Sequence, residues 1–289
     1  MAGAQSGGPA SGMMRRSTMD RARPFLDWPQ PIPFAHRGGA GDHPENTLPA
    51  FAAAVQMGYR YLETDVHLTA DGAVMAFHDG VLDRVTDRAG PIASLTAAEV
   101  EQADAGFSFS PDGGRTFPHR GRGVRIPRLD ALLDAWPQVR VNIDPKSDAV
   151  VEPLVAVLRR HDAFERVCIG SFSDARIARV RALSGDAVCT SMGPRATAVA
   201  WAACRTGRIP RQGADCMQIP LRTRGIPLLT PALLRAAHRS GLRVHVWTID
   251  DRAEMERLLD LGVDGIMTDR IAVLREVMEG RGSWVTPPA

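Results

Sequence analysis

The sequence predicts an α/β fold, a (β/α)8 barrel of the TIM type, on three observations. Short β-rich runs alternate with amphipathic helical patterns along the 289 residues, which indicates parallel strands joined by crossover helices. Nine runs are expected to form strands, and two of them are too close for a crossover helix, so they occupy one barrel position. The remaining count is eight, the number that closes a parallel barrel of about 250 residues.

The elements follow one another in a regular order. Strands are expected at Ile32–Ala35, Tyr61–Val66, Val74–Phe77, Val139–Asp144, Arg166–Ser171, Ala187–Thr190, Cys216–Ile219, Arg243–Thr248 and Gly265–Thr268. Helices are expected between most of them, at Leu48–Met57, Val150–His161, Ala175–Leu183, Pro231–Ser240 and Ala253–Leu261.

A hairpin is expected between the second and third strands, because Asp71-Gly72 lies midway between them and Asp-Gly is typical of a two-residue turn. In that register Ala70 faces Ala73, and Asp65 faces His78. Directly opposed residues share a face of the ribbon. The turn therefore predicts a carboxylate beside an imidazole.

Three segments do not fit the repeat. Residues 81–128 contain a Gly/Pro/Arg-rich stretch and one short helical pattern, Leu95–Gln102, so we expect an inserted loop region of the kind that often carries specificity. Residues 1–25 and 280–289 are small, polar and without periodicity, which predicts a disordered N-terminal tail and a flexible C-terminal tail. The barrel domain then spans 26–279.

The composition excludes several classes of protein. Hydrophobic residues at 44% and charged residues at 24% exclude general disorder, a collagen-like fibre and a coiled coil. No apolar run approaches the roughly 18 residues that cross a bilayer, and no secretory signal is recognisable. We therefore expect a cytoplasmic protein without stable membrane insertion. The net charge of +2, without a basic block, gives no indication of a nucleic-acid partner.

Two residue types are unusually distributed. Lys146 is the only lysine among 35 basic residues, which suggests chemistry that a guanidinium cannot supply, although chance survival in an arginine-rich chain is the alternative. The four cysteines, Cys168, Cys189, Cys204 and Cys216, show no C-x-x-C spacing and lie mostly in apolar segments. This favours buried thiols in a reducing compartment over a disulfide or a zinc site.

Polar residues gather where the predicted strands end, which is the catalytic face of such a barrel. Glu63 and Asp65 are two apart on a strand and so share a face. Asp144, at the end of another strand, supplies a third carboxylate. Converging carboxylates repel one another unless a hard divalent cation lies between them, and oxygen ligands favour magnesium, calcium or manganese.

Several motifs occur in a fixed order. They are AHRG (Ala35–Gly38), PENT (Pro44–Thr47), ETDV (Glu63–Val66), the T-x-D-G turn (Thr69–Gly72), FHD (Phe77–Asp79), VWT (Val246–Thr248) and GVDGIMTD (Gly262–Asp269). In these motifs the chain resembles the glycerophosphodiester phosphodiesterases, members of the phosphatidylinositol-phospholipase-C-like barrel superfamily. The resemblance covers about Pro33 to Arg270. The chain departs from the family at Asp144-Pro145-Lys146, where Glu-x-Lys is usual, and this change can alter the metal position or preference.

The resemblance implies metal-dependent hydrolysis of a small glycerophosphodiester to glycerol 3-phosphate and an alcohol. It implies that His36 and His78 are the acid and base, with His78 favoured as the acid. One divalent cation, Mg²⁺, Ca²⁺ or Mn²⁺, would be held by Glu63, Asp65 and Asp144. No oligomeric state is implied.

Four further residues would bind the substrate. Arg37 and Lys146 would neutralise phosphoryl oxygens, because a compact ammonium fits between a phosphate and a carboxylate-bound metal better than a planar guanidinium does. Gln218 and Trp247 would line the pocket, or else fill the top of the barrel. Asp79 is expected to brace the loop that carries His78.

Two alternatives stay open. One is phospholipase D-like hydrolysis of lysophospholipids, with the apolar segment Ala198–Cys204 as a candidate contact for an acyl chain, although core packing also explains that segment. The other is a catalytically inactive phosphate-binding protein. Retention of both histidines and all three carboxylates argues against the latter, because binding alone needs no acid and base.

Overall fold

The computed structural model describes residues 23–29, 31–185 and 187–285. Its main sheet contains eight parallel strands: β1 (Ile32–Ala35), β2 (Tyr61–Leu68), β4 (Arg140–Pro145), β5 (Val167–Ile169), β6 (Cys189–Thr190), β7 (Cys216–Pro220), β10 (Arg243–Trp247) and β11 (Gly265–Thr268). They pair in the order β6-β5-β4-β2-β1-β11-β10-β7. A single bridge, Ser191 to Cys216, joins the ends of this order. The ring is nearly closed, which confirms the predicted barrel.

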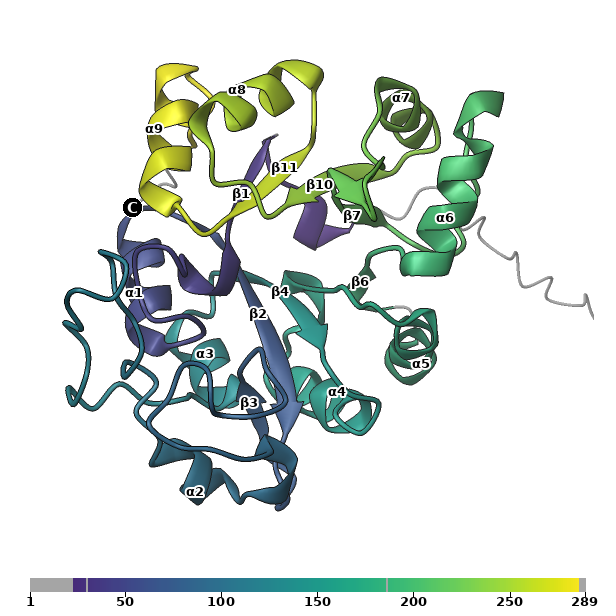
Figure 1. Ribbon diagram of the computed structural model, residues 1–289. Coiled ribbons are helices and arrows are strands. Elements are labelled where there is room, and N and C mark those ends of the chain that lie inside the picture. The colour runs from purple at the N-terminus through teal and green to yellow at the C-terminus, as the bar shows by residue number, and fades with distance from the viewer. Residues whose placement is uncertain (1–22, 30, 186, 286–289) are drawn as a thin grey trace, which may run out of the picture.

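Helices surround the ring of strands (Figure 1). They are α1 (Leu48–Gln56), α3 (Leu129–Ala135), α4 (Val151–Arg160), α5 (Asp174–Ser184), α6 (Pro194–Ala203), α7 (Pro231–Arg239), α8 (Arg252–Leu261) and α9 (Ile271–Gly280). Short 3-10 helices occur at η1 (Pro24–Leu26), η2 (His36–Gly38), η3 (Ile92–Ser94), η4 (Phe164–Arg166) and η5 (Cys204–Thr206). Within the described residues, no helix is long and apolar enough to cross a membrane.

The hairpin register predicted from Asp71-Gly72 is wrong by one residue. β2 pairs antiparallel with β3 (Val74–Ala76), and Leu68 lies opposite Val74. The turn is a three-residue loop, in which the N–H of Thr69 donates to the carbonyl of Ala73 at 3.0 Å and Gly72 has a φ of 85°. The third position of such a loop needs a left-handed backbone, which glycine adopts without a steric penalty.

This correction changes how His78 reaches the site. Asp65 lies opposite Phe77, whose N–H donates to the Asp65 carbonyl at 2.9 Å. The predicted pairing of Asp65 with His78 therefore does not exist. His78 instead follows the end of β3, and both side chains line the same pocket.

The inserted region folds around a small core of its own. It contains η3 and α2 (Ala97–Glu101), and it lies beside α3 in Figure 1. Its buried side chains are Phe77, Leu82, Ile92, Ala97, Val100, Ala103, Ala105, Val124 and Ile126, together with Met75 of the hairpin. A hydrogen bond of 2.9 Å from Ala76 N–H to the carbonyl of Pro127 ties the end of the region to β3.

The described chain begins and ends in packed positions. Phe25 is completely buried at the amino end of the barrel, where its carbonyl accepts a hydrogen bond of 2.5 Å from the hydroxyl of Tyr61. At the other terminus Trp284 packs edge-on against Tyr59 at 5.1 Å. Parts of both predicted tails are therefore packed, while 1–22 and 286–289 lie outside the described residues.

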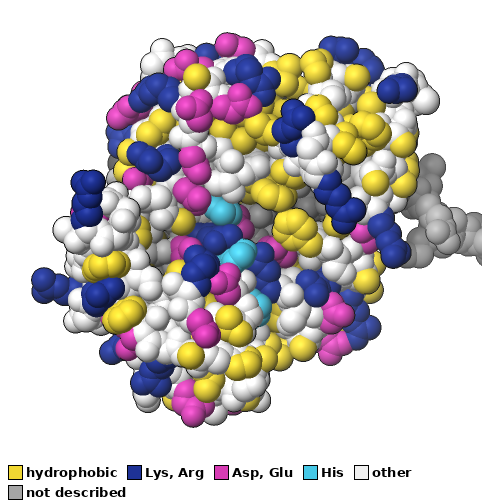
Figure 2. All heavy atoms as spheres, in the orientation of Figure 1, with side chains coloured by type: hydrophobic (Ala, Val, Ile, Leu, Met, Phe, Trp, Pro, Cys, Tyr) yellow, Lys and Arg dark blue, Asp and Glu magenta, His cyan; other side chains and the backbone are white. Residues whose placement is uncertain are grey.

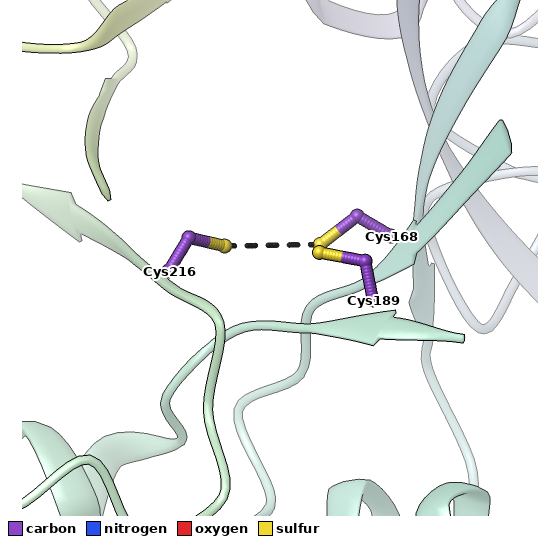
Figure 3. A group of neighbouring side chains, drawn as sticks. All are labelled: Cys168, Cys189 and Cys216. Carbon is purple, nitrogen blue, oxygen red and sulfur yellow. Dashed lines mark hydrogen bonds between the residues drawn. The ribbon is translucent and has the colours of Figure 1, made fainter. Parts of the chain in front are cut away.

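Figure 2 shows a hollow on one face of the molecule, where histidine, basic and acidic side chains lie beside hydrophobic ones. Deeper in the barrel lies a group of thiols (Figure 3). All four cysteines are buried free thiols. Cys168, Cys189 and Cys216 come from β5, β6 and β7, and their sulfur atoms lie within 4.8 Å of one another.

Candidate active site

The hollow is a pocket of about 360 Å³ at the carboxyl ends of the strands. Each of the nine residues predicted for the site lines it: His36, Arg37, Glu63, Asp65, His78, Asp144, Lys146, Gln218 and Trp247. One wall is apolar and includes Phe172, Met192, Pro194 and Leu228. The predicted site residues thus share one cavity, which is polar on one side and apolar on the other.

The turn after β1 places His36 and Arg37. Arg37 has a left-handed backbone with a φ of 50°, and Gly38 follows with a φ of 83°. A Cβ at Gly38 would lie 2.9 Å from the Cβ of Ala50 in α1, so glycine is required for this close approach. The turn directs the N–H of Arg37 to Oε2 of Glu63, 3.1 Å away.

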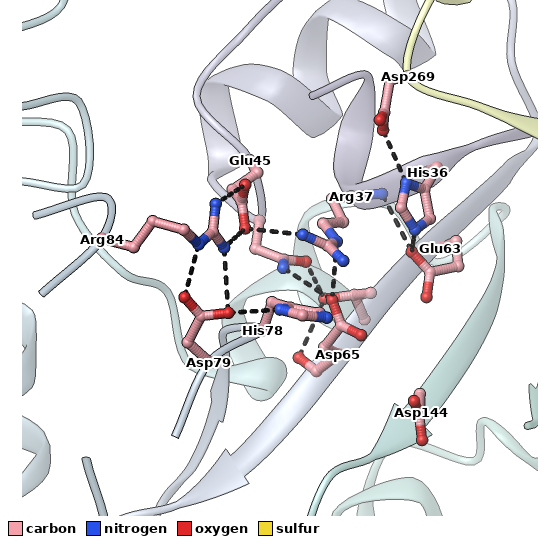
Figure 4. A network of polar contacts seen from close by, with 12 residues as sticks. His36, Arg37, Glu45, Glu63, Asp65, His78, Asp79, Arg84, Asp144 and Asp269 are labelled. Carbon is pink, nitrogen blue, oxygen red and sulfur yellow. Dashed lines mark hydrogen bonds and ion pairs between the residues drawn. The ribbon is translucent and has the colours of Figure 1, made fainter. Parts of the chain in front are cut away.

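His36 lies between two carboxylates (Figure 4). Its Nδ1 is 2.7 Å from Oδ1 of Asp269, and its Nε2 is 3.7 Å from Oε2 of Glu63. Although burial lowers it, the pKa of His36 is raised overall because both negative charges favour the imidazolium. Asp269 follows β11 in the GVDGIMTD motif, but sequence reasoning assigned it no role in the site.

Asp65 is the most heavily paired carboxylate of the pocket. It accepts a hydrogen bond of 3.1 Å from Nδ2 of Asn46 and forms ion pairs with Nε of Arg37 at 3.2 Å and Nζ of Lys146 at 2.8 Å. Burial raises the pKa of Asp65, but the positive charges of Lys146, Arg37 and His78 outweigh this effect and lower it. Asp65 is therefore an anion at neutral pH.

The pKa of Glu63 is shifted in the opposite direction, although Glu63 lies only two residues from Asp65 on β2. Burial and the negative charge of Asp65 raise the pKa of Glu63 to about 7, against the weaker opposing effects of His36 and Arg37. A carboxyl group in this condition is stabilised as an anion by any further positive charge.

Lys146 joins the other two carboxylates. Its Nζ lies 2.8 Å from Oδ1 of Asp65 and 2.8 Å from Oδ2 of Asp144. These charges raise the pKa of Lys146 although burial lowers it. Oδ1 of Asp144 is buried without a hydrogen-bond partner, and burial raises the pKa of this carboxyl.

The predicted metal ligands do not meet at one point in this arrangement. Among the described residues, only the three cysteines bring three ligand atoms within 4.8 Å of one another. Glu63, Asp65 and Asp144 line the same pocket, but the ammonium of Lys146 lies between the last two. The three carboxylates therefore share a cavity, and Asp65 and Asp144 also share a counter-charge.

His78 is held by a chain of ion pairs from the inserted region (Figure 4). Its Nδ1 lies 2.5 Å from Oδ1 of Asp79, as expected of a brace. Arg84 donates to Asp79 at 2.6 Å and to Glu45 at 2.7 Å and 2.8 Å. Its hydrogen bonds lower the pKa of Asp79 to about 2. Sequence reasoning missed Arg84, because only the folded insertion brings it to this loop.

The last two predicted residues are tied to neighbours that the sequence did not single out. Gln218 donates a hydrogen bond of 2.7 Å to Oδ1 of Asn142. Trp247 packs edge-on against Phe172 with ring centroids 5.6 Å apart. The ring of Phe172 also lies 5.7 Å from Nζ of Lys146, so the apolar wall begins directly beside the ammonium.

The fold and the pocket together define the class: a (β/α)8-barrel enzyme with its polar site at the carboxyl ends of the strands. Sequence comparison places the chain more closely, because the glycerophosphoryl diester phosphodiesterase family model matches residues 36–273. The chain belongs to this family and is an enzyme, a glycerophosphodiester phosphodiesterase. The resemblance seen in its motifs is thereby confirmed.

Relatives match along most of their length. A Mycobacterium tuberculosis protein named probable glycerophosphodiester phosphodiesterase 2 is 39% identical over 261 residues, which cover 88% of this chain and 92% of the relative. A glycerophosphodiester phosphodiesterase of Caldanaerobacter subterraneus is 30% identical over 249 residues, covering 81% of this chain and 92% of its own. A solved structure from Silicibacter pomeroyi with the same family name superposes with a TM-score of 0.76 at 27% identity, covering 90% of this chain and 98% of that one.

Proposed function

We propose that this enzyme hydrolyses glycerophosphodiesters to glycerol 3-phosphate and an alcohol through acid and base catalysis by two histidines. The observation that carries the proposal is that His36 and His78 line one pocket and each is held through Nδ1 by a carboxylate. The distances are 2.7 Å to Asp269 and 2.5 Å to Asp79. A carboxylate on Nδ1 keeps a proton there and leaves Nε2 to exchange protons with the substrate.

The two carboxylate partners differ, and this difference suggests which histidine is the base. Asp269 and Glu63 together favour protonation of His36 and raise its pKa, which strengthens it as the base that takes the proton of the attacking nucleophile. Asp79 is already paired with Arg84, whereas His36 faces two carboxylates. His78 is then the acid that protonates the leaving alcohol.

Positive charge for the phosphoryl oxygens comes from Arg37 and Lys146. Arg37 is anchored by Glu45 at 3.1 Å and by Asp65. Lys146 is anchored by two carboxylates. Donors fixed before the substrate arrives stabilise developing charge without reorganisation.

Two features of the pocket fit one divalent cation, Mg²⁺, Ca²⁺ or Mn²⁺. Asp144 has a buried oxygen without a partner, and burial together with the charge of Asp65 raises the pKa of Glu63, so a further positive charge there would be favourable. We propose Glu63, Asp65 and Asp144 as the residues that hold the ion. When bound, it supplies Lewis-acid stabilisation of the phosphoryl group.

The apolar wall favours a second candidate substrate. Phe172, Met192, Pro194 and Leu228 form a surface that a small polar head group does not need. A lysophospholipid would place its acyl chain against such a wall. The site chemistry stays the same for both substrates.

A panel assay tests the proposal. The full chain is incubated with glycerophosphocholine, glycerophosphoethanolamine, glycerophosphoinositol and lysophosphatidylcholine, and products are identified by phosphorus NMR, with and without prior chelation. We expect glycerol 3-phosphate from at least one glycerophosphodiester, loss of turnover on chelation and recovery with a divalent cation. Lysophosphatidic acid as the main product would favour lysophospholipids as the substrate. Full turnover after exhaustive chelation would contradict the proposal that the reaction needs a divalent cation.

A further inference from the structure

Three thiols meet inside the barrel below the active-site pocket. Cys168 and Cys189 are partners in the register of β5 and β6, and Cys216 lies on β7 across the gap (Figure 3). The sulfur atoms of Cys168 and Cys216 are 3.8 Å apart, and all three sulfurs lie within 4.8 Å of one another. Their exposure is 0%, 2% and 0% for Cys168, Cys189 and Cys216.

This thiol cluster is separate from the phosphodiesterase machinery. The side chain of Gln218, which lines the pocket, lies between the two sites and has its amide nitrogen 3.8 Å from the sulfur of Cys168. Below that point the interior is apolar, with Phe25, Ile32, Phe34, Tyr61 and Met267 in one buried group with the cysteines. Trp247, which lines the pocket, packs against this group.

His245 is an unexplained polar group in the same interior. It is completely buried, and neither ring nitrogen has a hydrogen-bond partner. In the strand register it lies level with Gln218, two residues along β7 from Cys216, and its ring nitrogens lie outside the 4.8 Å group that the three sulfurs form. Burying an imidazole without a partner costs free energy, so such a group calls for an explanation such as a bound ion.

We infer that Cys168, Cys189, Cys216 and His245 form a structural zinc site inside the barrel. Three cysteines and one histidine are a standard ligand set for tetrahedral zinc. With Zn–S bonds of about 2.3 Å, the edge of the tetrahedron is about 3.8 Å, which equals the separation of the Cys168 and Cys216 sulfurs.

Zinc binding at this site is an exchange of thiol protons for the metal ion. Zn²⁺ replaces three thiol protons, which leave to solvent, and a neutral imidazole nitrogen completes the site. No oxidant or reductant is needed. A disulfide between two of these cysteines would require a sulfur separation of about 2.05 Å and would leave the third thiol and His245 without partners.

The position of the thiol cluster indicates how a bound zinc ion would stabilise the barrel. β6 and β7 share a single bridge, Ser191 to Cys216, with hydrogen bonds from Asp215 N–H to the Thr190 carbonyl at 2.9 Å and from Met192 N–H to the Cys216 carbonyl at 3.0 Å. Their register is the shortest among the described neighbouring strands of the ring. Cys168 and Cys189 lie on one side of this bridge and Cys216 lies on the other. A zinc ion bound to all three would fasten the ring where its strand register is shortest.

The decisive measurement uses cobalt as a probe. The full chain is unfolded and refolded without oxygen in the presence of Co²⁺, because the site is buried, and is then washed with EDTA to remove ions from the open pocket. We expect an intense thiolate-to-cobalt charge-transfer absorption and the strong visible bands of tetrahedral Co²⁺, displaced by Zn²⁺. Wild-type protein without these bands would overturn the inference, whatever the behaviour of any variant.

Matched variants locate the ion. Cys216→Ser is expected to lose the bands, while Cys204→Ser, a buried cysteine outside the cluster, keeps them. Glu63→Gln is also expected to keep them, which separates this site from the cation of the proposed reaction. If Cys216→Ser fails to fold, Cys189→Ala serves instead. Loss of the cobalt bands in Cys204→Ser as well as in Cys216→Ser would contradict the zinc site. A wild-type mass lower by two hydrogens would show a disulfide and would also contradict it.

Discussion

Lys146 places one ammonium between Asp65 and Asp144, at 2.8 Å from each. A guanidinium keeps the charge but is planar and larger, so it cannot occupy the same point. We expect Lys146→Arg to fold with an unchanged melting temperature and to lower kcat/KM for glycerophosphodiesters by about 10²-fold, as for other preorganised donors. Wild-type kinetics in this variant would mean that the lone lysine is an accident of composition.

Glu63 links cation binding to pH. Its pKa of about 7, above the ordinary 4.5, means that the folded protein without a cation retains a proton that the unfolded chain releases. Stability therefore falls as the pH rises from about 4.5 to about 7. A cation bound through Glu63 displaces this proton.

We therefore expect the affinity for Mg²⁺ or Ca²⁺ to rise about tenfold per pH unit up to about pH 7 and then to level off. Calorimetric titrations between about pH 5.5 and about pH 8 measure this. Glu63→Gln is the control and is expected to bind weakly at every pH. An affinity of the wild type that does not change with pH would show that Glu63 is not a ligand.

The inserted region is connected to the catalytic site through Arg84. This side chain ties Asp79, the partner of His78, to Glu45 in the loop before α1. We expect Arg84→Ala to lower kcat by about tenfold, or about 1.4 kcal/mol of barrier, because His78 loses its fixed orientation. Arg88→Ala is the control, because the Arg88 guanidinium donates to Gln102 within the same region. Equal rates in the two variants would contradict a positioning role for Arg84.

The periodicity of the sequence was sufficient for the order of the strands, but three of the helices, α3, α6 and α9, were not predicted. Strands β1 and β11 have the predicted bounds, because each is an apolar run between clear turn signals. Helix α6 was not predicted: its sequence PRATAVAWAA lacks a strongly polar face, although Pro194 at its first position is a helix-start signal. The hairpin register was missed because a two-residue and a three-residue loop both accommodate Asp71-Gly72.

At the scale of the whole molecule, the amino end of the barrel is closed by Phe25. Its ring packs edge-on against Tyr61 at 5.2 Å and has no exposed surface. We expect Phe25→Ala to lower the free energy of unfolding by about 3–5 kcal/mol in urea. Phe172→Ala removes the same atoms from a side chain that is 65% exposed and is expected to cost about 0.5 kcal/mol. Similar losses in both variants would contradict the role of Phe25 as a seal.

Some features of the candidate site could be predicted from the sequence, and others depend on the fold. Polar residues at strand ends were predictable, because all parallel strands of a barrel end on one face. The pairings of Lys146 with Asp65 and of Arg84 with Glu45 depend on the bends of loops. The meeting of Cys168, Cys189 and Cys216 depends on the register of three strands, so the absence of a C-x-x-C spacing was a poor guide to it.

We propose that His78 and His36 act as acid and base on one phosphodiester. Both His36→Ala and His78→Ala are expected to lower kcat for glycerophosphocholine by about 10²- to 10⁴-fold. The most direct test repeats the measurement with the p-nitrophenyl ester of glycerol 3-phosphate, whose leaving group needs little protonation. We expect this substrate to restore turnover in His78→Ala and not in His36→Ala. Undiminished rates in either variant, or an identical response of both to the new leaving group, would contradict the account.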